Sequence, residues 1–304
     1  MKEEAHSVRL GLLALAAAVL ASGSALAQAP SGDLPLRWEE LTAPDFARAV
    51  ERSAGTCIIP LGIIEKHGPH LPLGTDLLDV REVAERAAKA EYAIVFPPYY
   101  FGQIFEARHQ PGTIAYSERL IWDVLQATLD EVARNGIKKI VLVSGHGGNN
   151  SFLPFFCQAQ LARRRDYAVY LFQPASDPEH DAAVKRLRKT TMEMHAGEVE
   201  TSTVLAHRPD LVRLDRAKEQ SGADQARLAG LSNVYTAIWW YARFPNHYAG
   251  DGTPGSRDLG ELVIASQAKQ LAQTIRAVKA DTKVLELQDR FFGEAESPLR
   301  TPQK

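Results

Sequence analysis

Short apolar runs alternate along the chain with longer segments of helical periodicity. The apolar runs predict buried strands at 57–64, 92–96, 137–143 and 167–172. Apolar positions that recur every three or four residues predict helices at 75–90, 118–134, 150–165 and 258–285. Alternation of strand and helix is typical of a mainly parallel sheet with helices on both faces. The pattern therefore predicts one α/β domain.

The first 27 residues have the layout of a secretory signal peptide. Lys2 and Arg9 precede an apolar run at 10–21, and Ala25-Leu26-Ala27 forms a small-x-small cleavage site. The run is shorter than the about 20 residues of a membrane-spanning helix, which argues against the alternative of an uncleaved anchor. We therefore expect cleavage near Ala27 and a secreted or periplasmic protein. Its parts would be a signal peptide at 1–27, a linker at 28–36, one folded domain at 37–290 and a C-terminal tail at 291–304.

Charge and cysteine content exclude several classes of protein. The 35 basic and 37 acidic side chains leave a net charge of −2, so nothing favours nucleic acid or an acidic membrane surface as partner. Two cysteines, Cys57 and Cys157, are too few for a disulfide scaffold. Since Cys57 lies in a predicted buried strand, we expect two separate thiols, with a disulfide as the alternative.

Three candidate metal ligands follow the first predicted strand. Glu65 and His67 are two residues apart, so on an extended backbone their side chains point the same way. The prolines and glycine between 68 and 75 force an irregular turn that can bring Asp76 back toward them. Two carboxylates and an imidazole suit Zn, Mn or Fe, and the two oxygens of Asp76 can bridge two ions.

A glycine-rich turn with a central histidine, 144–149, follows the third predicted strand. In open α/β sheets ligands bind beyond the carboxyl ends of the strands, so His146 is expected near the first cluster. The alternative is a phosphate cradle at the start of the next helix. A phosphate-binding loop would carry a lysine where His146 stands, which favours the metal.

A third cluster contains His195, Glu198 and Glu200. Residues two apart on a helix diverge, so Glu198 and Glu200 cannot face one point. One is predicted to be a metal ligand, and the other an acid–base group or a structural partner. His195 is a candidate for moving a proton between nucleophile and leaving group. Histidines without a convergent partner are expected to be structural: His70, His207 and His247.

An aromatic segment at 239–248 leaves two interpretations open. Trp239-Trp240-Tyr241, with aromatic residues after it, is suited to covering a flat or cyclic substrate. The same segment is equally suited to packing the core or an oligomer interface.

The three clusters together resemble the motifs of the creatininase (creatinine amidohydrolase) family. The first resembles it in Glu65-x-His67-Gly68-x-His70-Leu71-Pro72-x-x-Thr75-Asp76. The second and third resemble it in Gly145-His146-Gly147-Gly148-Asn149 and His195-Ala196-Gly197-x-x-Glu200-Thr201-Ser202. Pro111-Gly112-Thr113 and Gly250-Asp251-Gly252-Thr253-Pro254 are similar to further family elements. The likeness runs from about residue 40 to 275.

The resemblance implies a three-layer α/β fold and two divalent ions, Zn, Mn or Fe. Glu65, Asp76 and His146 would hold one ion, and His67 with Asp76 the other. Creatininase itself has a carboxylate at the position of Gly148, so Glu200 is the candidate that completes the second site.

The implied activity is metal-dependent hydrolysis of an amide C–N bond by a metal-activated water. His195 is the expected general acid, with Glu198 as the other candidate. The substrate is a small-molecule amide, and ring amides, formamides and terminal peptide bonds all stay open. A homo-oligomer is also implied. The competing functions are a non-catalytic metal- or ligand-binding protein on the same fold, and a phosphate enzyme that uses the glycine-rich turn.

Overall fold

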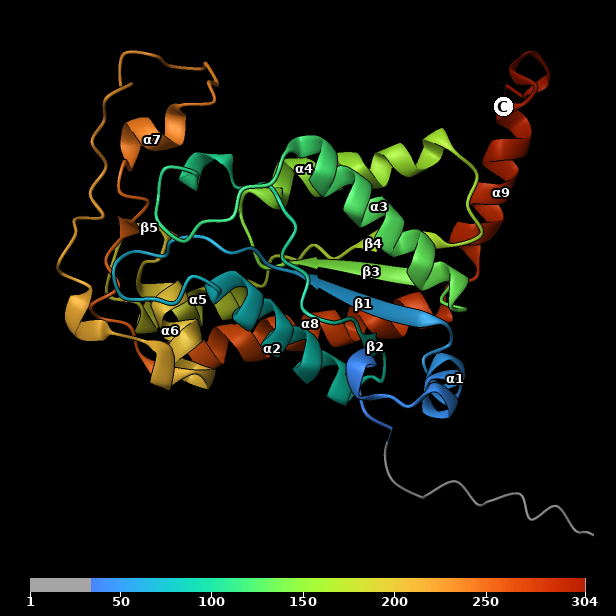
Figure 1. The fold of residues 1–304 in the computed structure, drawn as a ribbon, viewed down its shortest axis with the longest axis horizontal. Coiled ribbons are helices and arrows are strands. Elements are labelled where there is room, and N and C mark those ends of the chain that lie inside the picture. Colours follow the sequence, from blue (N-terminus) through green and yellow to red (C-terminus); the bar gives the residue numbers. More distant parts are fainter. Residues whose placement is uncertain (1–33, 304) are drawn as a thin grey trace, which may run out of the picture. The chain divides into compact units, whose positions relative to one another are not determined.

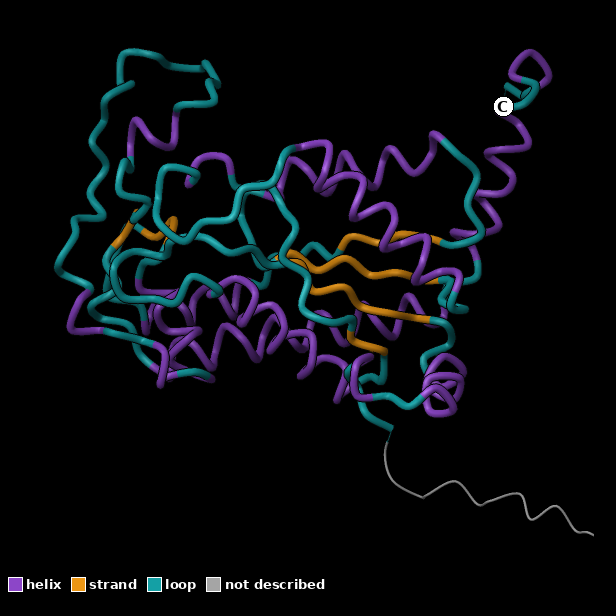
Figure 2. The backbone as a smooth tube through the Cα atoms, viewed as in Figure 1, coloured by secondary structure: helices purple, strands orange, loops and turns teal. Residues whose placement is uncertain are grey.

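The computed structural model describes residues 34–303, so the predicted signal peptide lies outside the described residues. Its main sheet has four parallel strands in the order β2-β1-β3-β4, drawn in orange in Figure 2. The strands are β1 (Thr56–Leu61), β2 (Ile94–Val95), β3 (Lys139–Ser144) and β4 (Ala168–Leu171). They are the four strands that the apolar runs predict, with slightly shorter bounds.

Helices cover both faces of this sheet (Figure 1). On one face lie α3 (Glu118–Arg134) and α4 (Asn149–Gln158), and on the other α2 (Thr75–Ala90) and α8 (Arg257–Ala280). Cys57 and Ile59 of β1 pack into the first core and Ile58 into the second, because successive strand residues point to opposite faces. The predicted three-layer α/β architecture is confirmed.

The chain also forms five further helices, a second, two-stranded sheet and several 3-10 turns among the described residues. The helices are α1 (Ala43–Arg52), α5 (Pro178–Leu187), α6 (Glu198–His207), α7 (Trp239–Arg243) and α9 (Lys283–Ala295). An antiparallel pair is formed by β5 (Glu193–His195) and β6 (Ala249–Gly250). Six 3-10 turns are described: η1 (Trp38–Glu40), η2 (Phe105–Ala107), η3 (Ala159–Ala162), η4 (Pro209–Leu211), η5 (Leu214–Arg216) and η6 (Pro298–Arg300).

Two predicted helices differ from the structure at their ends. The single helix expected at 258–285 is two helices, because the Asp281 carboxylate accepts hydrogen bonds from the backbone N–H of Lys283 (3.0 Å) and Val284 (3.2 Å) and so caps a new helix, α9. The helix expected at 150–165 ends at Gln158 and continues as the 3-10 turn η3.

Two further expectations concern the thiols and membranes. Cys57 and Cys157 are both free, as predicted. Between residues 34 and 303, no helix combines the length and apolar character that crossing a bilayer requires.

Candidate metal centre

The carboxyl ends of β1 and β3 bring the first and second clusters together. The two strands pair in parallel with Leu61 beside Ser144, so the segments that follow them leave from the same edge of the sheet. There Nδ1 of His146 lies 2.9 Å from Oε1 of Glu65 and 2.9 Å from Oδ2 of Asp76. Residues 81 positions apart in the chain thus form one compact group, as expected from the strand ends.

A second group of ligand atoms lies beside the first. Nε2 of His67 is 2.9 Å from Oδ1 of Asp76, whose other oxygen faces His146. Ligand atoms of Glu65, His67 and His195 lie within 4.8 Å of one another, as do those of Glu65, Asp76 and His146. The two buried triads share Glu65, and Asp76 points one carboxylate oxygen toward each imidazole.

Backbone carbonyls set the orientation of three imidazoles in the site. His67 donates through Nδ1, whereas His146 and His195 donate through Nε2. Their acceptors, at 3.2, 2.8 and 2.8 Å, are the carbonyls of Glu65, Gln103 and Lys66 respectively. A carbonyl can only accept, so each of these nitrogens carries a proton, and the opposite nitrogen of each ring is the one that can bind a metal in exchange for any proton it holds.

The charge balance of the site fits divalent cations. Glu65 and Asp76 are 1% and 4% exposed, and Glu65 Oε1 and Asp76 Oδ2 have no hydrogen-bond partner among residues 34–303. Burial disfavours a charge on His67, but the Asp76 carboxylate outweighs it and raises the pKa of His67 to about 10. The carboxylates therefore favour positive charge here, and this nitrogen and oxygen donor set suits Zn, Mn or Fe.

The third cluster divides, because Glu198 and Glu200 diverge at the start of α6. Both oxygens of Glu198 accept hydrogen bonds from backbone N–H groups of Lys189 and Thr190, at 2.6 to 2.9 Å, so the structure does not bring Glu198 to the triads. Oε2 of Glu200 lies 4.0 Å from His67 Nε2 and 3.8 Å from His195 Nδ1. Of the two glutamates, only Glu200 faces the metal-ligand atoms.

The expectation that His247 lacks a convergent partner is wrong. Its Nε2 lies 2.5 Å from Oε2 of Glu65, and its Nδ1 accepts a hydrogen bond of 2.8 Å from Nε1 of Trp240. An indole can only donate, so His247 carries its proton on Nε2 and donates it to the Glu65 carboxylate. His247 also has a left-handed φ of 55°, a conformation that few non-glycine residues adopt.

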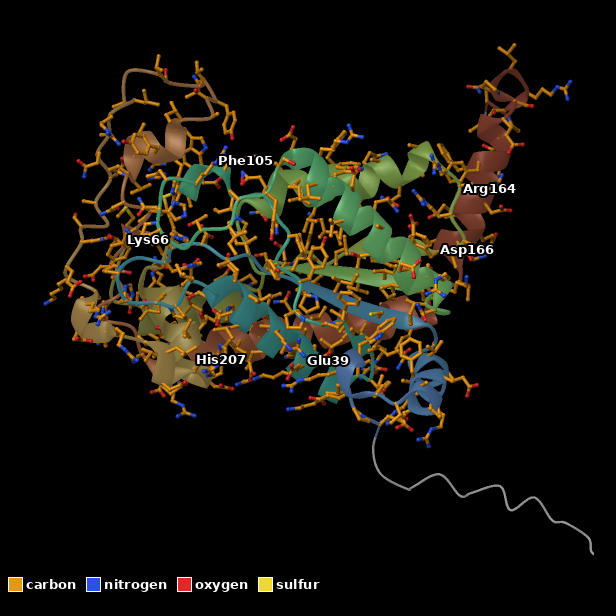
Figure 3. The ribbon with its side chains drawn as sticks, in the orientation of Figure 1. Glu39, Lys66, Phe105, Arg164, Asp166 and His207 are labelled. Atoms are coloured by element: carbon orange, nitrogen blue, oxygen red, sulfur yellow. The ribbon has the colours of Figure 1, made fainter. Side chains whose placement is uncertain are left out.

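The other two histidines expected to be structural have ordinary partners. Nε2 of His70 lies 2.8 Å from Oγ1 of Thr201, and Nε2 of His207 lies 2.7 Å from Oδ1 of Asp79. Figure 3 labels His207, which comes from the last turn of α6.

Lys66, also labelled in Figure 3, joins the loops around the site. Its largely buried ammonium donates to Oε1 of Gln110 (3.1 Å), Oε1 of Gln220 (2.7 Å) and the carbonyl of Asn246 (2.6 Å). The bond to Asn246 holds the residue next to His247. Three loop segments that are far apart in the chain are thereby joined to the segment after β1 that carries Glu65 and His67.

The surroundings of Gly148, beside His146, leave no room for a side chain. A Cβ atom there would lie 2.4 Å from Nε2 of His146 and 2.9 Å from the carbonyl oxygen of Gln103. These are the two groups whose hydrogen bond orients the His146 ring. The space that a side chain at 148 would enter is therefore filled by the His146 ring and the Gln103 carbonyl.

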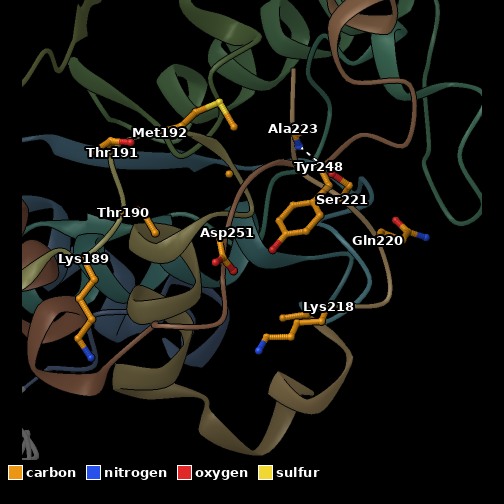
Figure 4. Close-up of a pocket in the computed structure, with 13 residues that line it drawn as sticks. Lys189, Thr190, Thr191, Met192, Lys218, Gln220, Ser221, Ala223, Tyr248 and Asp251 are labelled. Carbon is orange, nitrogen blue, oxygen red and sulfur yellow. Dashed lines mark hydrogen bonds between the residues drawn. The ribbon is translucent and has the colours of Figure 1, made fainter. Parts of the chain in front are cut away.

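Two cavities lie near this edge of the sheet. One of about 300 Å³ reaches His146, Gly147 and Glu200, whose side chain is 33% exposed, and gives access to the triads. Another, of about 560 Å³, is drawn in Figure 4 with Lys189, Tyr248 and Asp251 among its lining residues. No residue of either triad lines this second cavity.

Comparison with known proteins follows the same motifs. Residues 39–275 match the creatininase family, described as creatinine amidohydrolase. The chain belongs to the creatininase family. It is 28% identical over 261 residues to the creatinine amidohydrolase of Pseudomonas putida, which covers 78% of this chain and 95% of that protein.

Two further proteins are similar to this chain in sequence or fold. The mycofactocin precursor peptide peptidase of Mycolicibacterium smegmatis is 31% identical over 233 residues, which is 74% of this chain and 85% of that protein. A crystal structure of creatinine amidohydrolase (creatininase) superposes with a TM-score of 0.69 at 25% identity, covering 82% of this chain and 100% of that one. The protein is therefore a creatininase-family, metal-dependent amidohydrolase with a buried His, Glu and Asp metal site.

Proposed function

We propose that this protein hydrolyses an amide C–N bond of a small molecule with two divalent ions. Glu65, Asp76 and His146 would hold one ion, and His67, Asp76 and Glu200 the other. The observation that carries the proposal is Asp76, which points one buried oxygen at each of two imidazoles. Creatininase structures 23% identical to this chain are described as Zn–Zn type and Mn forms, so Zn and Mn are the first metals to test, with Fe.

The side chains of the site would divide the reaction between them. Two bound divalent ions would lower the pKa of a water and polarise the substrate carbonyl. Burial lowers the pKa of His195 to about 4, so the ring is neutral at neutral pH and its Nδ1 carries no proton before the reaction. His195 Nδ1 accepts the proton from the attacking water, while its Nε2 stays bonded to the Lys66 carbonyl.

The same proton then moves to the leaving nitrogen. The water hydroxyl bonds to the carbonyl carbon, the C–N bond breaks, and His195 returns its proton to the departing amine. The products are a carboxylic acid and an amine, so the atoms of one water are accounted for. His195 is preferred over Glu198 because both oxygens of Glu198 are already bonded to backbone N–H groups.

Relatives support two classes of substrate. One similar protein is named for creatinine, a ring amide, and another for a precursor peptide. Ring amides, formamides and terminal peptide bonds therefore form the first substrate screen.

Metal analysis of the purified protein tests the proposal. We expect about two equivalents in the wild type, loss of both in Asp76→Ala and loss of one in Glu200→Ala. Glu219→Ala, which removes an exposed carboxylate, is the control and should retain the wild-type content. No uptake of Zn, Mn or Fe by the wild type would contradict the hydrolase and leave a binding protein on the same fold.

We also propose that the chain is exported after cleavage behind Ala27. The basic residues, apolar run and small-x-small site at the N-terminus support this. Fractionation with N-terminal sequencing should find Gln28 as the first residue outside the cytoplasm. A full-length chain confined to the cytoplasm would contradict export.

A homo-oligomer is a further proposal, carried by the family resemblance. Light scattering after gel filtration of the purified mature chain measures it, and a mass of one chain would contradict it.

A further inference from the structure

A cavity of about 750 Å³ lies between η2 and α7, and no step of the proposed reaction uses it. Its volume is in the range of about 300–1,000 Å³ that is typical of sites for small molecules. Aromatic and aliphatic side chains form most of its wall: Phe105, Tyr235, Ile238, Trp239 and Tyr241. Phe105, on η2, is labelled in Figure 3.

The apolar lining is unusually open to solvent. Phe105 is 42% exposed, Tyr241 40%, Ile238 54% and Tyr235 82%. Single exposed apolar residues are ordinary, but several around one cavity mark a binding surface. A ligand that covered these side chains would gain free energy in proportion to the apolar area removed from water.

The wall of the cavity near η2 is in direct contact with a candidate metal ligand. Gln103 lines the cavity, and its carbonyl accepts the hydrogen bond that orients His146. Glu106, from the same wall, is hydrogen-bonded to Gln103 at 3.0 Å. Burial raises the pKa of Glu106, and the charges of His146 and Glu65 act on it too, so this wall lies within electrostatic reach of the triads.

The α7 wall is joined to the metal centre as well. Trp239 and Tyr241 line the cavity, while Trp240 between them donates to His247, which donates to Glu65. The short helix α7 therefore presents two rings to the cavity and a third to His247, which is hydrogen-bonded to Glu65. Trp240 also packs in a small core with Phe244, which is the core-packing alternative that the sequence leaves open for this segment.

Resting on the proposed function, we propose that this cavity receives an aromatic or large aliphatic group of the substrate, close to the scissile amide bond. The enzyme then acts on an extended, peptide-like amide. A compact ring amide bound at the metal centre would leave these apolar walls uncovered. An extended amide can reach both the metal centre and the cavity. In its hydrolysis, one water supplies the hydroxyl to the acyl carbon and the proton to the leaving nitrogen.

Binding of two hydroxamates to the metal-loaded protein tests this inference. Phenylalanine hydroxamate and glycine hydroxamate carry the same metal-binding group and differ in the benzyl side chain. Calorimetric titration should show the phenylalanine compound binding at least about tenfold more tightly, the gain from burying one ring. The double variant Tyr235→Ser/Ile238→Ser should reduce this ratio to near one and leave glycine hydroxamate unchanged.

Phe291→Ser is the matched control, because it removes a 43% exposed aromatic side chain from α9, outside the cavity. It should retain the full ratio. A wild-type ratio near one, or a ratio that survives the double variant, would overturn the cavity's role while leaving the proposed function intact. Failure of both hydroxamates to bind would overturn the proposed function and this inference with it.

Discussion

Glu65 uses its two carboxylate oxygens for different interactions. Oε1 faces Nδ1 of His146 in the metal centre, and Oε2 accepts the Nε2 proton of His247. Trp240 fixes the tautomer of His247 by donating to its Nδ1. Partners that orient metal ligands in this way are typically worth about 10- to 100-fold in metal affinity.

We therefore expect His247→Leu to weaken metal binding at the Glu65 site by about 10- to 100-fold. His247→Gln keeps an N–H donor and should retain most of the affinity, and Trp240→Phe should lose part of it. Competition with a chromogenic chelator measures all three. Unchanged affinity in His247→Leu would show that Glu65 needs no such partner, and equal losses in Leu and Gln would point to packing instead.

Gly148 and Gly147 are neighbours with opposite surroundings. A Cβ on Gly148 would collide with His146 and Gln103, whereas one on Gly147 would meet nothing within 4 Å. Gly148→Ala should therefore displace the His146 ring, weaken metal binding and lower the free energy of unfolding by about 1–3 kcal/mol. Gly147→Ala should change that free energy by no more than about 0.5 kcal/mol. Urea denaturation compares them, and equal effects would refute the steric explanation.

At the scale of elements, α8 packs against α6 through a glycine. A Cβ on Gly260 would lie 1.8 Å from the carbonyl oxygen of Ser202, so the two helix backbones approach as closely as they do only because no side chain intervenes. This packing places the start of α6, and with it Glu200, beside the triads. In α9, by contrast, a Cβ on Gly293 would meet nothing within 4 Å.

Alanine at these two helical glycines should have opposite effects. Gly260→Ala should lower the free energy of unfolding by about 1–3 kcal/mol, because α6 and α8 must separate. Gly293→Ala should raise it by about 0.5–1 kcal/mol, because alanine loses less conformational freedom than glycine on entering a helix. Urea denaturation gives both values. Stabilisation by Gly260→Ala would show that the two helices are not held so closely.

At the scale of the whole molecule, buried carboxylates lie together at the carboxyl ends of the strands, and folding removes them from water. Burial of Glu65 and Asp76 beside four imidazoles costs free energy unless opposite charge compensates it. Ions that bind only the folded chain at about 100 times their Kd add about 2.7 kcal/mol to the free energy of unfolding. Metal binding and global stability are therefore coupled in this protein.

Removing the metal should lower the melting temperature. For a domain of this size each kcal/mol corresponds to about 2–4 °C, so EDTA should lower the Tm of the loaded protein by about 5–10 °C. Added Zn or Mn should restore it. In Asp76→Ala the Tm should no longer respond to EDTA, which separates ion loss from other effects of the chelator. An unchanged wild-type Tm would contradict the coupling.

The parts of the site that were predictable depend on short spacings and on strand ends. Glu65 and His67 face one place because they are two apart on extended backbone, and Asp76 returns through a turn rich in proline. His146 joins them because parallel neighbours end at the same edge of a sheet. The divergence of Glu198 and Glu200 was also predictable, since it follows from helix geometry.

Other features depend on partners far apart in the chain. The contact between His247 and Glu65 spans 182 positions, and the carbonyl that orients His195 comes from Lys66, 129 positions away. The choice of Glu200 over Glu198 depended on distant backbone too: Lys189 and Thr190 occupy both oxygens of Glu198, whereas Glu200 accepts from Ala196 through Oε2 alone.

The sequence by itself thus determined the α/β layers, the family and the gathering of candidate ligands near the strand ends, because these follow from local periodicity, spacing and motifs. Only the tertiary structure decided which polar groups orient those ligands, where Trp239 and Trp240 point and where a cavity opens. Those features depend on how distant backbone segments pack, which local pattern does not encode.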